Sequence, residues 1–559
     1  MVTYIKENRE ILKKYIKWTC FVILLIIASM AILALGIEGL QNKTSVTQKI
    51  YDYNCTLCIF SIILHISYVF VNFVGEKKEI IKTRIKQFFK KEWPCLLLTI
   101  FMAWTAVGCL GAGIEASAEA KLKDIYPGYK AGMTAENTEK LKGYSSLTDI
   151  AEWSKTLRAE NAADRSWNGC ANLKDGYFSF LFYATIVVDV ILLGQNSEKM
   201  KKWILRIMML SMVLMAFLTF LNFNNSDFMN GIMPYKRAIF HNSNHYGYYL
   251  SIGVILCATM FIKEKNLYFK IIGLLGFIVT TYMAILNNTF GAYLGILVAI
   301  VGMLIYSIVG VFSSRNSLED NKDTSNKANP VAQLLKIITI VLIFGSFSFS
   351  ITEPNKEKPI VIVNFETTYK DIGIWLDAAK SNEENYVEVN NNDKIDSEKN
   401  NKTDNNDEKE TISKSAIANT GSGSGQVWVG VFELVKQTPF FGWGLENLLN
   451  EFYNQLDINE GRTHNLVLQL MGTTGIVGML LYMVAVIAIF IRCLKRIKNW
   501  NMLEYITIFC FISYMVSSLF GNSAFYTSPY FMIILGILIT ANWNEKTVEK
   551  QKVNEKKNK

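Results

Sequence analysis

The chain alternates between long apolar stretches and shorter polar segments along most of its length. A helix needs about 20 mostly apolar residues to cross roughly 30 Å of hydrocarbon. The pattern therefore predicts an all-α, polytopic membrane protein with about 12 transmembrane helices. The expected spans are 18–39, 56–74, 94–114, 176–194, 203–222, 245–262, 268–287, 290–312, 332–351, 465–491, 502–520 and 527–543. Composition supports this class, because 51% of the 559 residues are hydrophobic and the mean hydropathy is +0.21.

Basic residues gather in alternate loops. The loops after the second, fourth and tenth expected spans are rich in Lys and Arg, whereas segments 40–55, 287–289 and 521–527 carry few or none. Since Lys and Arg favour the cytoplasmic side, we expect both termini to be cytoplasmic. The net charge of +9 indicates contact with cytoplasmic-leaflet lipids rather than with nucleic acid.

The polar segments divide the chain into four parts. Residues 1–351 form a membrane domain with spans 1–9 and an outer loop at 115–175. Residues 352–464 form a large extracytoplasmic loop, 465–543 hold spans 10–12, and 544–559 are a basic cytoplasmic tail.

The large loop changes character along its length. Residues 359–380 predict an ordered segment that is first extended and then helical. Residues 381–425 contain too few apolar residues to bury a core, so we expect disorder there. Residues 426–438 carry apolar residues at helical spacing, which predicts an amphipathic helix on the membrane surface or against the outer ends of the spans.

Three of the four histidines occur in two short polar motifs that adjoin apolar segments. His241 and His245 lie within residues 236–249, and His464 lies within 461–465. Polar groups at a membrane are costly unless they contact a ligand or each other, so these motifs are the candidates for chemistry. The fourth histidine, His65, lies within span two and is expected to be a hydrogen-bonded core residue.

Three features together resemble the O-antigen ligase and polymerase family of polytopic membrane glycosyltransferases. An Arg and an Asn precede a span in the segment from Arg237 to Asn244. A predicted helix is followed by Pro439 and a Gly-Trp-Gly turn at 442–444. A Thr-His-Asn step at 463–465 leads into a Gly-rich span. The sequence departs from the family pattern at Phe290 and Ser424, where family members often carry Arg.

The resemblance implies transfer of a glycan from a polyprenyl diphosphate, such as undecaprenyl diphosphate, onto a hydroxyl group outside the cell. Cations would stabilise the leaving diphosphate, with Arg237 as the first candidate and Arg462 as the second, because a guanidinium grips phosphate oxygens in bidentate fashion. His464 would be the general base toward the acceptor or a donor to the diphosphate. Neither a metal nor another cofactor is expected.

Further residues would bind the substrate. Lys236 adds positive charge, Asn244 and Asn465 would orient sugar or phosphate groups, and Tyr246 and Trp443 offer flat faces to sugar rings. The expected partners are a polyprenyl-diphosphate-linked oligosaccharide, an acceptor glycan and membrane lipids.

Several alternatives remain open at this point. Arg237 alone could be a snorkelling anchor, His241 and His245 could share a helix face as metal ligands, and Trp428 could be a membrane-interface aromatic. Glycines 472, 475 and 478 are expected to be close-packing positions. Polymerisation of a capsule or exopolysaccharide is favoured over ligation. The rival functions are a transporter or flippase of lipid-linked sugars and a non-catalytic, glycan-binding member of the same family.

Overall fold

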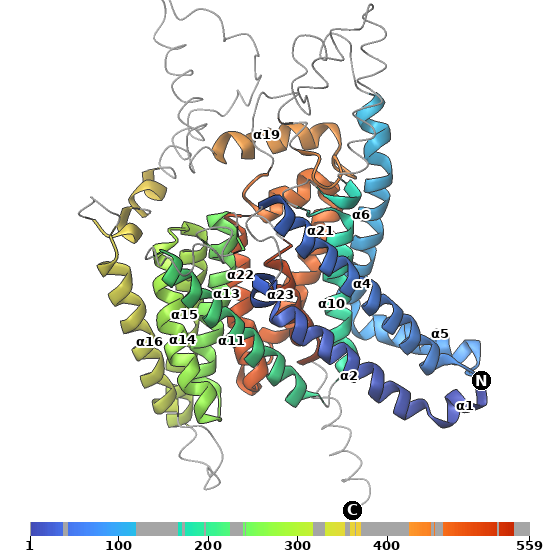
Figure 1. Cartoon of the computed structure of the whole chain (residues 1–559), viewed down its shortest axis with the longest axis horizontal. Helices are drawn as coiled ribbons and strands as arrows, with labels where there is room; N and C mark the ends of the chain where they lie inside the picture. The colour runs from blue at the N-terminus through green and yellow to red at the C-terminus, as the bar shows by residue number, and fades with distance from the viewer. Residues whose placement is uncertain are drawn as a thin grey trace, which may run out of the picture. The chain divides into compact units, whose positions relative to one another are not determined.

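The computed structural model is all-helical in the part of the chain that it describes, apart from one isolated bridge between Thr352 and Pro359 (Figure 1). The described residues are 2–36, 43–118, 166–169, 174–194, 197–223, 237, 239–240, 242–316, 330–352, 358–363, 365–370, 424–448, 452, 462–521 and 525–541.

Eight described helices contain a stretch long and apolar enough to cross a membrane, which confirms a multi-pass membrane protein. Each coincides with one of the twelve expected spans. They are α4 (Lys43–Phe73), α6 (Trp93–Ala118), α11 (Glu198–Phe223), α13 (Ser243–Lys263), α14 (Leu267–Leu286), α15 (Phe290–Asn316), α16 (Pro330–Ser350) and α21 (Leu466–Leu494).

The other four expected spans differ from this group. Helices α10 (Tyr177–Leu193), α22 (Met502–Ser518) and α23 (Ser528–Ala541) are apolar but shorter. The first expected span is divided into α2 (Arg9–Ala28), α3 (Met30–Leu33) and the 3₁₀ helix η1 (Ala34–Gly36). The division falls at Ser29, whose hydroxyl donates to the carbonyls of Leu25 and Ile26 in the preceding turn. The count of about 12 spans therefore stays a prediction.

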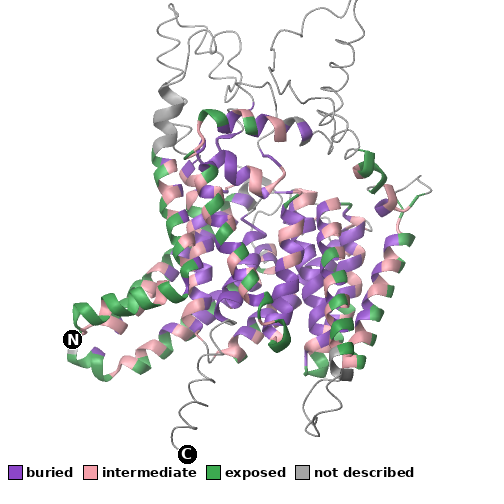
Figure 2. Cartoon of the chain, turned by 180° about the vertical axis from the view of Figure 1, so that it is seen from behind, coloured by how far each residue is buried: buried purple, intermediate pink, exposed green. Residues whose placement is uncertain are grey.

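The chain forms two compact units. The first unit comprises 1–99, 171–361 and 483–559, and the second comprises 100–170 and 362–482. Helix α13 is the centre of the first unit, because 94% of its apolar window is buried against α14, α15 and α22 (Figure 2). Gly273 of α14 permits this contact, since an added Cβ would lie 2.9 Å from the backbone nitrogen of Phe261.

The second unit has its own apolar core. Helix α19 (Ser424–Gln437) covers the predicted amphipathic segment 426–438. Its apolar face is buried in a cluster with the turn that follows it and with the start of α21. This helix was expected either on the membrane surface or against the outer ends of the spans, and its contact with Met471 of α21 agrees with the second placement. The cluster contains Val427, Val431, Leu434, Val435, Trp443, Leu448, Phe452 and Met471.

Helix α21 is broken at Gly475, which has φ 73°. The expected close packing at Gly472, Gly475 and Gly478 is confirmed, because an added Cβ at each would lie within 3.0 Å of a neighbouring atom, but the break at Gly475 was not expected. An added Cβ at Gly475 would lie 2.0 Å from the carbonyl oxygen of Phe440, so only glycine admits this backbone approach. The turn after α19 also forms hydrogen bonds with backbone groups of α21 that the break leaves without partners in the helix. Trp443 N donates to Gly472 O, and Ile476 N donates to Pro439 O.

Other loop expectations have different outcomes. The extended start of 359–380 is wrong, because residues 360–363 are already helical, as are 365–370. Most of the outer loop 115–175, the expected disordered stretch up to residue 423 and the tail 544–559 lie outside the described residues.

Candidate functional site

In the first unit, a hydrogen-bond network holds Arg237 where three helices end or begin. The Nε atom of Arg237 donates to Oδ1 of Asn287 at 2.8 Å. Asn287 follows the last residue of α14 and is buried. Its Nδ2 donates to the carbonyl of Ser243, the first residue of α13, and to Oγ1 of Thr289, just before α15, both at 2.8 Å. Asn287 therefore fixes the base of the Arg237 guanidinium.

The two terminal nitrogens of this guanidinium donate to no described residue. Among contacts between described residues, Arg237 donates only through Nε and otherwise lies 5.9 Å from the ring of Phe223. Burial lowers the pKa of Arg237 below its usual range, while Tyr246 acts in the opposite direction. A guanidinium stays protonated at neutral pH despite such a shift. The two terminal nitrogens thus form a cationic fork suited to phosphate oxygens.

The other predicted residues of this motif have different positions. Asn244 lies half-buried in the first turn of α13, where its backbone N–H donates to the Asn242 side chain that caps the helix. Tyr246 is fully buried among Phe240 and Tyr249, so it offers no face to a sugar in this structure. Lys236 and His241 lie outside the described residues.

In the second unit, Arg462 is buried in an ion pair. Its Nη2 donates to Oε1 of Glu446 at 2.5 Å, and both side chains are about 95% buried. The expectation that Arg462 holds a diphosphate does not match this arrangement, because the guanidinium already faces a carboxylate. Arg462 instead fixes the approach of the chain to His464 by tying it to the turn after α19.

His464 has an uncommon backbone conformation with φ 51°, in the left-handed region. The residues on either side are held firmly. Thr463 accepts from the indole Nε1 of Trp428 at 2.6 Å through its carbonyl and donates through its N–H to Oε1 of Gln469. Strained residues of this kind persist only where the surroundings hold them, and they gather at functional sites. His464 itself is half-buried.

Asn465 and Trp443 have structural duties in the second unit. The Oδ1 atom of Asn465 accepts from the backbone N–H groups of Val467 and Leu468, which makes it the N-cap of α21. Trp443 is buried in the core, and its Nε1 donates to the carbonyl of Leu434. Trp443 therefore offers no face to a sugar in this structure.

Three residues that matter for this geometry were missed from the sequence. Asn287 has a detectable signal, because an Asn-Asn-Thr turn between two apolar stretches must place polar groups at a membrane boundary. Trp428 was interpreted as an interface aromatic, yet it holds the His464 loop. Glu446 could not be paired with Arg462 from sequence, since that contact depends on how the intervening loop closes.

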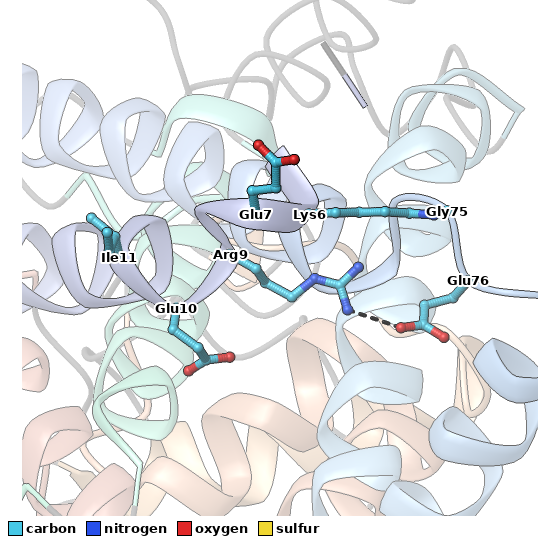
Figure 3. Close-up of a pocket in the computed structure, with 7 residues that line it drawn as sticks. All are labelled: Lys6, Glu7, Arg9, Glu10, Ile11, Gly75 and Glu76. Atoms are coloured by element: carbon cyan, nitrogen blue, oxygen red, sulfur yellow. Dashed lines mark hydrogen bonds and ion pairs between the residues drawn. The ribbon is translucent and has the colours of Figure 1, made fainter. Parts of the chain in front are cut away.

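A shallow pocket elsewhere in the first unit contains none of the predicted site residues. It lies between the N-terminal helices α1 (Val2–Glu7) and α2 and the turn at Gly75 (Figure 3). Arg9 donates to Glu76 across it at 2.9 Å, and Glu7 and Glu10 point away from this pair. The charges of the Arg9–Glu76 pair are already matched, so the pocket is not the candidate site.

Residues 275–483 match the family model described as O-antigen ligase. The chain carries an O-antigen ligase family domain. The matched part contains Asn287, α19 and His464, whereas Arg237 lies outside it. The class of function is thus membrane glycan processing of the O-antigen ligase and polymerase type. No curated protein matches the chain.

Proposed function

We propose that the chain transfers or polymerises polyprenyl-diphosphate-linked glycan units on the outer face of the bacterial cytoplasmic membrane. The observation that carries the proposal is the family match over 275–483, which includes His464 directly before a membrane span. Polymerisation of a capsule or exopolysaccharide is the preferred version. On this proposal the donor is a polyprenyl-diphosphate-linked oligosaccharide and the acceptor is a glycan hydroxyl.

The proposed step is a displacement at the anomeric carbon of the donor. The acceptor oxygen forms a bond to that carbon, while the bond from the carbon to the diphosphate oxygen breaks. The proton of the acceptor hydroxyl passes to His464, and the electron pair of the broken bond remains on the diphosphate. Arg237 stabilises the growing negative charge through its terminal nitrogens, an effect worth on the order of 3 kcal/mol for one fixed donor.

The geometry changes the roles expected for other residues. Arg462 becomes a positioning residue through Glu446, so Lys236 is the second cation of the proposal. The side-chain amides of Asn244 and Asn465 are still proposed to orient sugar or phosphate groups. Family members often have Arg at position 290, but here Phe290 packs against Phe520 with ring centroids 5.5 Å apart and carries no charge. Arg237, which is hydrogen-bonded to Asn287 just after α14, is therefore the proposed source of positive charge at this place.

The test is genetic complementation with surface glycan sized on a gel. A deletion strain would receive wild type, His464→Ala, Arg237→Ala or the control Arg84→Ala, at matched membrane levels. Arg84 lies exposed on α5 (Lys78–Lys91), a helix that carries none of the proposed site residues. We expect wild type and the control to restore long chains and both site variants to leave single repeat units. Full-length glycan from both site variants would refute the assignment.

The break in α21 is the observation that favours the rival function, a flippase of lipid-linked sugars, because transporters often use interrupted spans. In this chain, the Pro439–Gly444 turn hydrogen-bonds to backbone groups at the break, which makes it a poor binding site. The same complementation separates the functions. A flippase defect leaves no repeat units at the outer face, whereas a polymerase defect leaves single units there. A non-catalytic glycan-binding protein would tolerate His464→Ala.

A further inference from the structure

Two lysines of the first unit connect neighbouring ends of α13 and α16, and neither has an acidic partner in the part of the chain that the structure describes. Lys263, the last residue of α13, donates from Nζ to Oε1 of Gln333 on α16 at 2.6 Å. Lys336 of α16 donates from Nζ to the carbonyl of Ile262 on α13 at 3.2 Å. Both acceptors are neutral. Neither lysine forms an ion pair with any described residue, so among these residues no acidic side chain compensates the two positive charges.

Acidic side chains close to these helix ends are engaged elsewhere. Glu264 receives Nε and Nη2 of Arg206, both at 3.0 Å, in a bidentate pair. Glu504 faces Arg496 at 3.1 Å and also caps α22 through the N–H of Asn501. Lys270, near the start of α14, adds further positive charge next to Lys336. Within the described residues, this surface therefore lacks a free carboxylate for its lysines.

Tyr and Trp rings gather at the helix ends that carry the two lysines. The ring of Tyr306 stacks on Trp500 with centroids 5.2 Å apart, and the ammonium of Lys263 lies 4.4 Å from the centroid of Tyr505. Tyr and Trp gather where a membrane-spanning helix meets the headgroup region. The helices involved are the apolar spans α13, α15 and α16, together with the shorter apolar helix α22.

Exposed apolar side chains continue from the lysines along the spans. Val331, Leu335 and Ile338 lie exposed on α16, and Leu267 and Ile271 lie exposed on α14. A ligand with an anionic phosphate and hydrocarbon chains would match this surface, the phosphate at the lysines and the chains along the exposed apolar side chains. Free phosphate would match only the lysines.

We propose that Lys263 and Lys336 bind the phosphate of an anionic phospholipid headgroup. Lys270 supports them, and the apolar side chains on α14 and α16 contact the acyl chains. Charge without a counter-ion is costly at a partly buried position, and a lipid phosphate supplies that counter-ion. On the predicted orientation, this end of the helices faces the cytoplasmic leaflet, where basic pockets between spans bind anionic lipids. The proposal is independent of the glycan chemistry.

The test uses the purified full chain in phosphatidylcholine nanodiscs with increasing phosphatidylglycerol. Bound phosphatidylglycerol is counted by native mass spectrometry, and the melting temperature is followed in parallel. The double variant Lys263→Gln/Lys336→Gln is compared with Lys495→Gln/Lys498→Gln, which removes the same charge from two exposed lysines between α21 and α22. Each lysine near a membrane surface contributes on the order of fivefold in affinity, so we expect roughly a 30-fold loss for the first pair.

We expect the control pair to bind phosphatidylglycerol as wild type does. Equal lipid binding by both double variants would overturn the proposal. The proposal would also be overturned if inorganic phosphate raised the melting temperature of wild type as much as phosphatidylglycerol does, because the acyl chains would then have no role. If Lys263→Gln prevents folding, the single variant Lys336→Gln tests the same site, since that lysine is more exposed and donates only to a backbone carbonyl.

Discussion

Gly475 is the residue on which the shape of α21 depends most directly. An alanine there would combine a left-handed backbone with a Cβ 2.0 Å from the Phe440 carbonyl. We expect Gly475→Ala to lower the free energy of unfolding by about 3 kcal/mol or more. The measurement is the melting temperature in detergent, together with the yield from membranes.

Gly345 provides the matched control for this substitution. It lies inside α16, and an added Cβ would meet no atom within 4 Å. Alanine removes the excess backbone freedom of glycine in a helix, so Gly345→Ala should be neutral or stabilising by about 0.5–1 kcal/mol. If the two variants melt alike, close approach of the Phe440 backbone does not hold α21 in its broken form.

Asn287 decides how Arg237 presents its charge. Asn287→Asp would keep the acceptor for Arg237 Nε but add a negative charge beside the guanidinium and remove the donors to Ser243 and Thr289. We expect glycan transfer to fall by about tenfold to a hundredfold, because a misplaced catalytic cation loses transition-state stabilisation. The lost donors and the added charge will also lower the melting temperature, but the loss in kcat should persist at temperatures where the variant is fully folded. A drop in melting temperature that accounts for the whole loss would indicate a purely structural role.

At this scale, the sequence predicted which residues are polar and interfacial, but not what each one contacts. Asn465 was expected to meet substrate, yet its side-chain oxygen Oδ1 caps α21. Arg462 was expected to meet diphosphate, yet Glu446 lies beside it. Capping could have been read from an Asn directly before an apolar run. The Arg462–Glu446 pair could not, because loop closure brings the two together.

Among the elements, α4 and α10 are joined inside the membrane by a buried polar cluster. Asp189 of α10 is fully buried, accepts from Ser61 Oγ at 2.7 Å, and is hydrogen-bonded to His65 Nε2 at 2.8 Å. Asp189→Leu would leave both partners without their acceptor. We expect a loss of roughly 1–3 kcal/mol for each stranded group, measured as a lower melting temperature in detergent.

A compensated variant separates lost hydrogen bonding from altered packing in this cluster. Replacing both sides of a buried hydrogen bond with apolar groups of similar shape is nearly neutral. Asp189→Leu combined with Ser61→Ala and His65→Leu should therefore recover much of the stability that Asp189→Leu alone loses. If the triple variant melts no higher than the single one, the cluster does not hold α4 to α10 through these bonds.

Long apolar runs were the strongest signal for whole elements. Eight expected spans coincide with apolar helices of membrane length because about 20 consecutive apolar residues have few other uses. The same pattern could not reveal the break in α21, since the approach of Phe440 comes from a turn more than thirty residues away in sequence. It also predicted an extended start at 359–380 where β-branched residues cluster, although the chain is helical there.

For the whole molecule, the proposed function gives Arg237 and His464 roles in one reaction. Residues that act in the same transition state give losses that do not multiply. We expect Arg237→Ala/His464→Ala to be scarcely less active than the worse single variant, measured as the rate of chain extension with a lipid-linked donor in proteoliposomes. Losses that multiply would show that the two residues serve separate steps, and would leave one of them outside the catalytic site. All three variants must melt close to the temperature of wild type. A shared unfolding defect could otherwise make the double variant scarcely less active than the worse single variant.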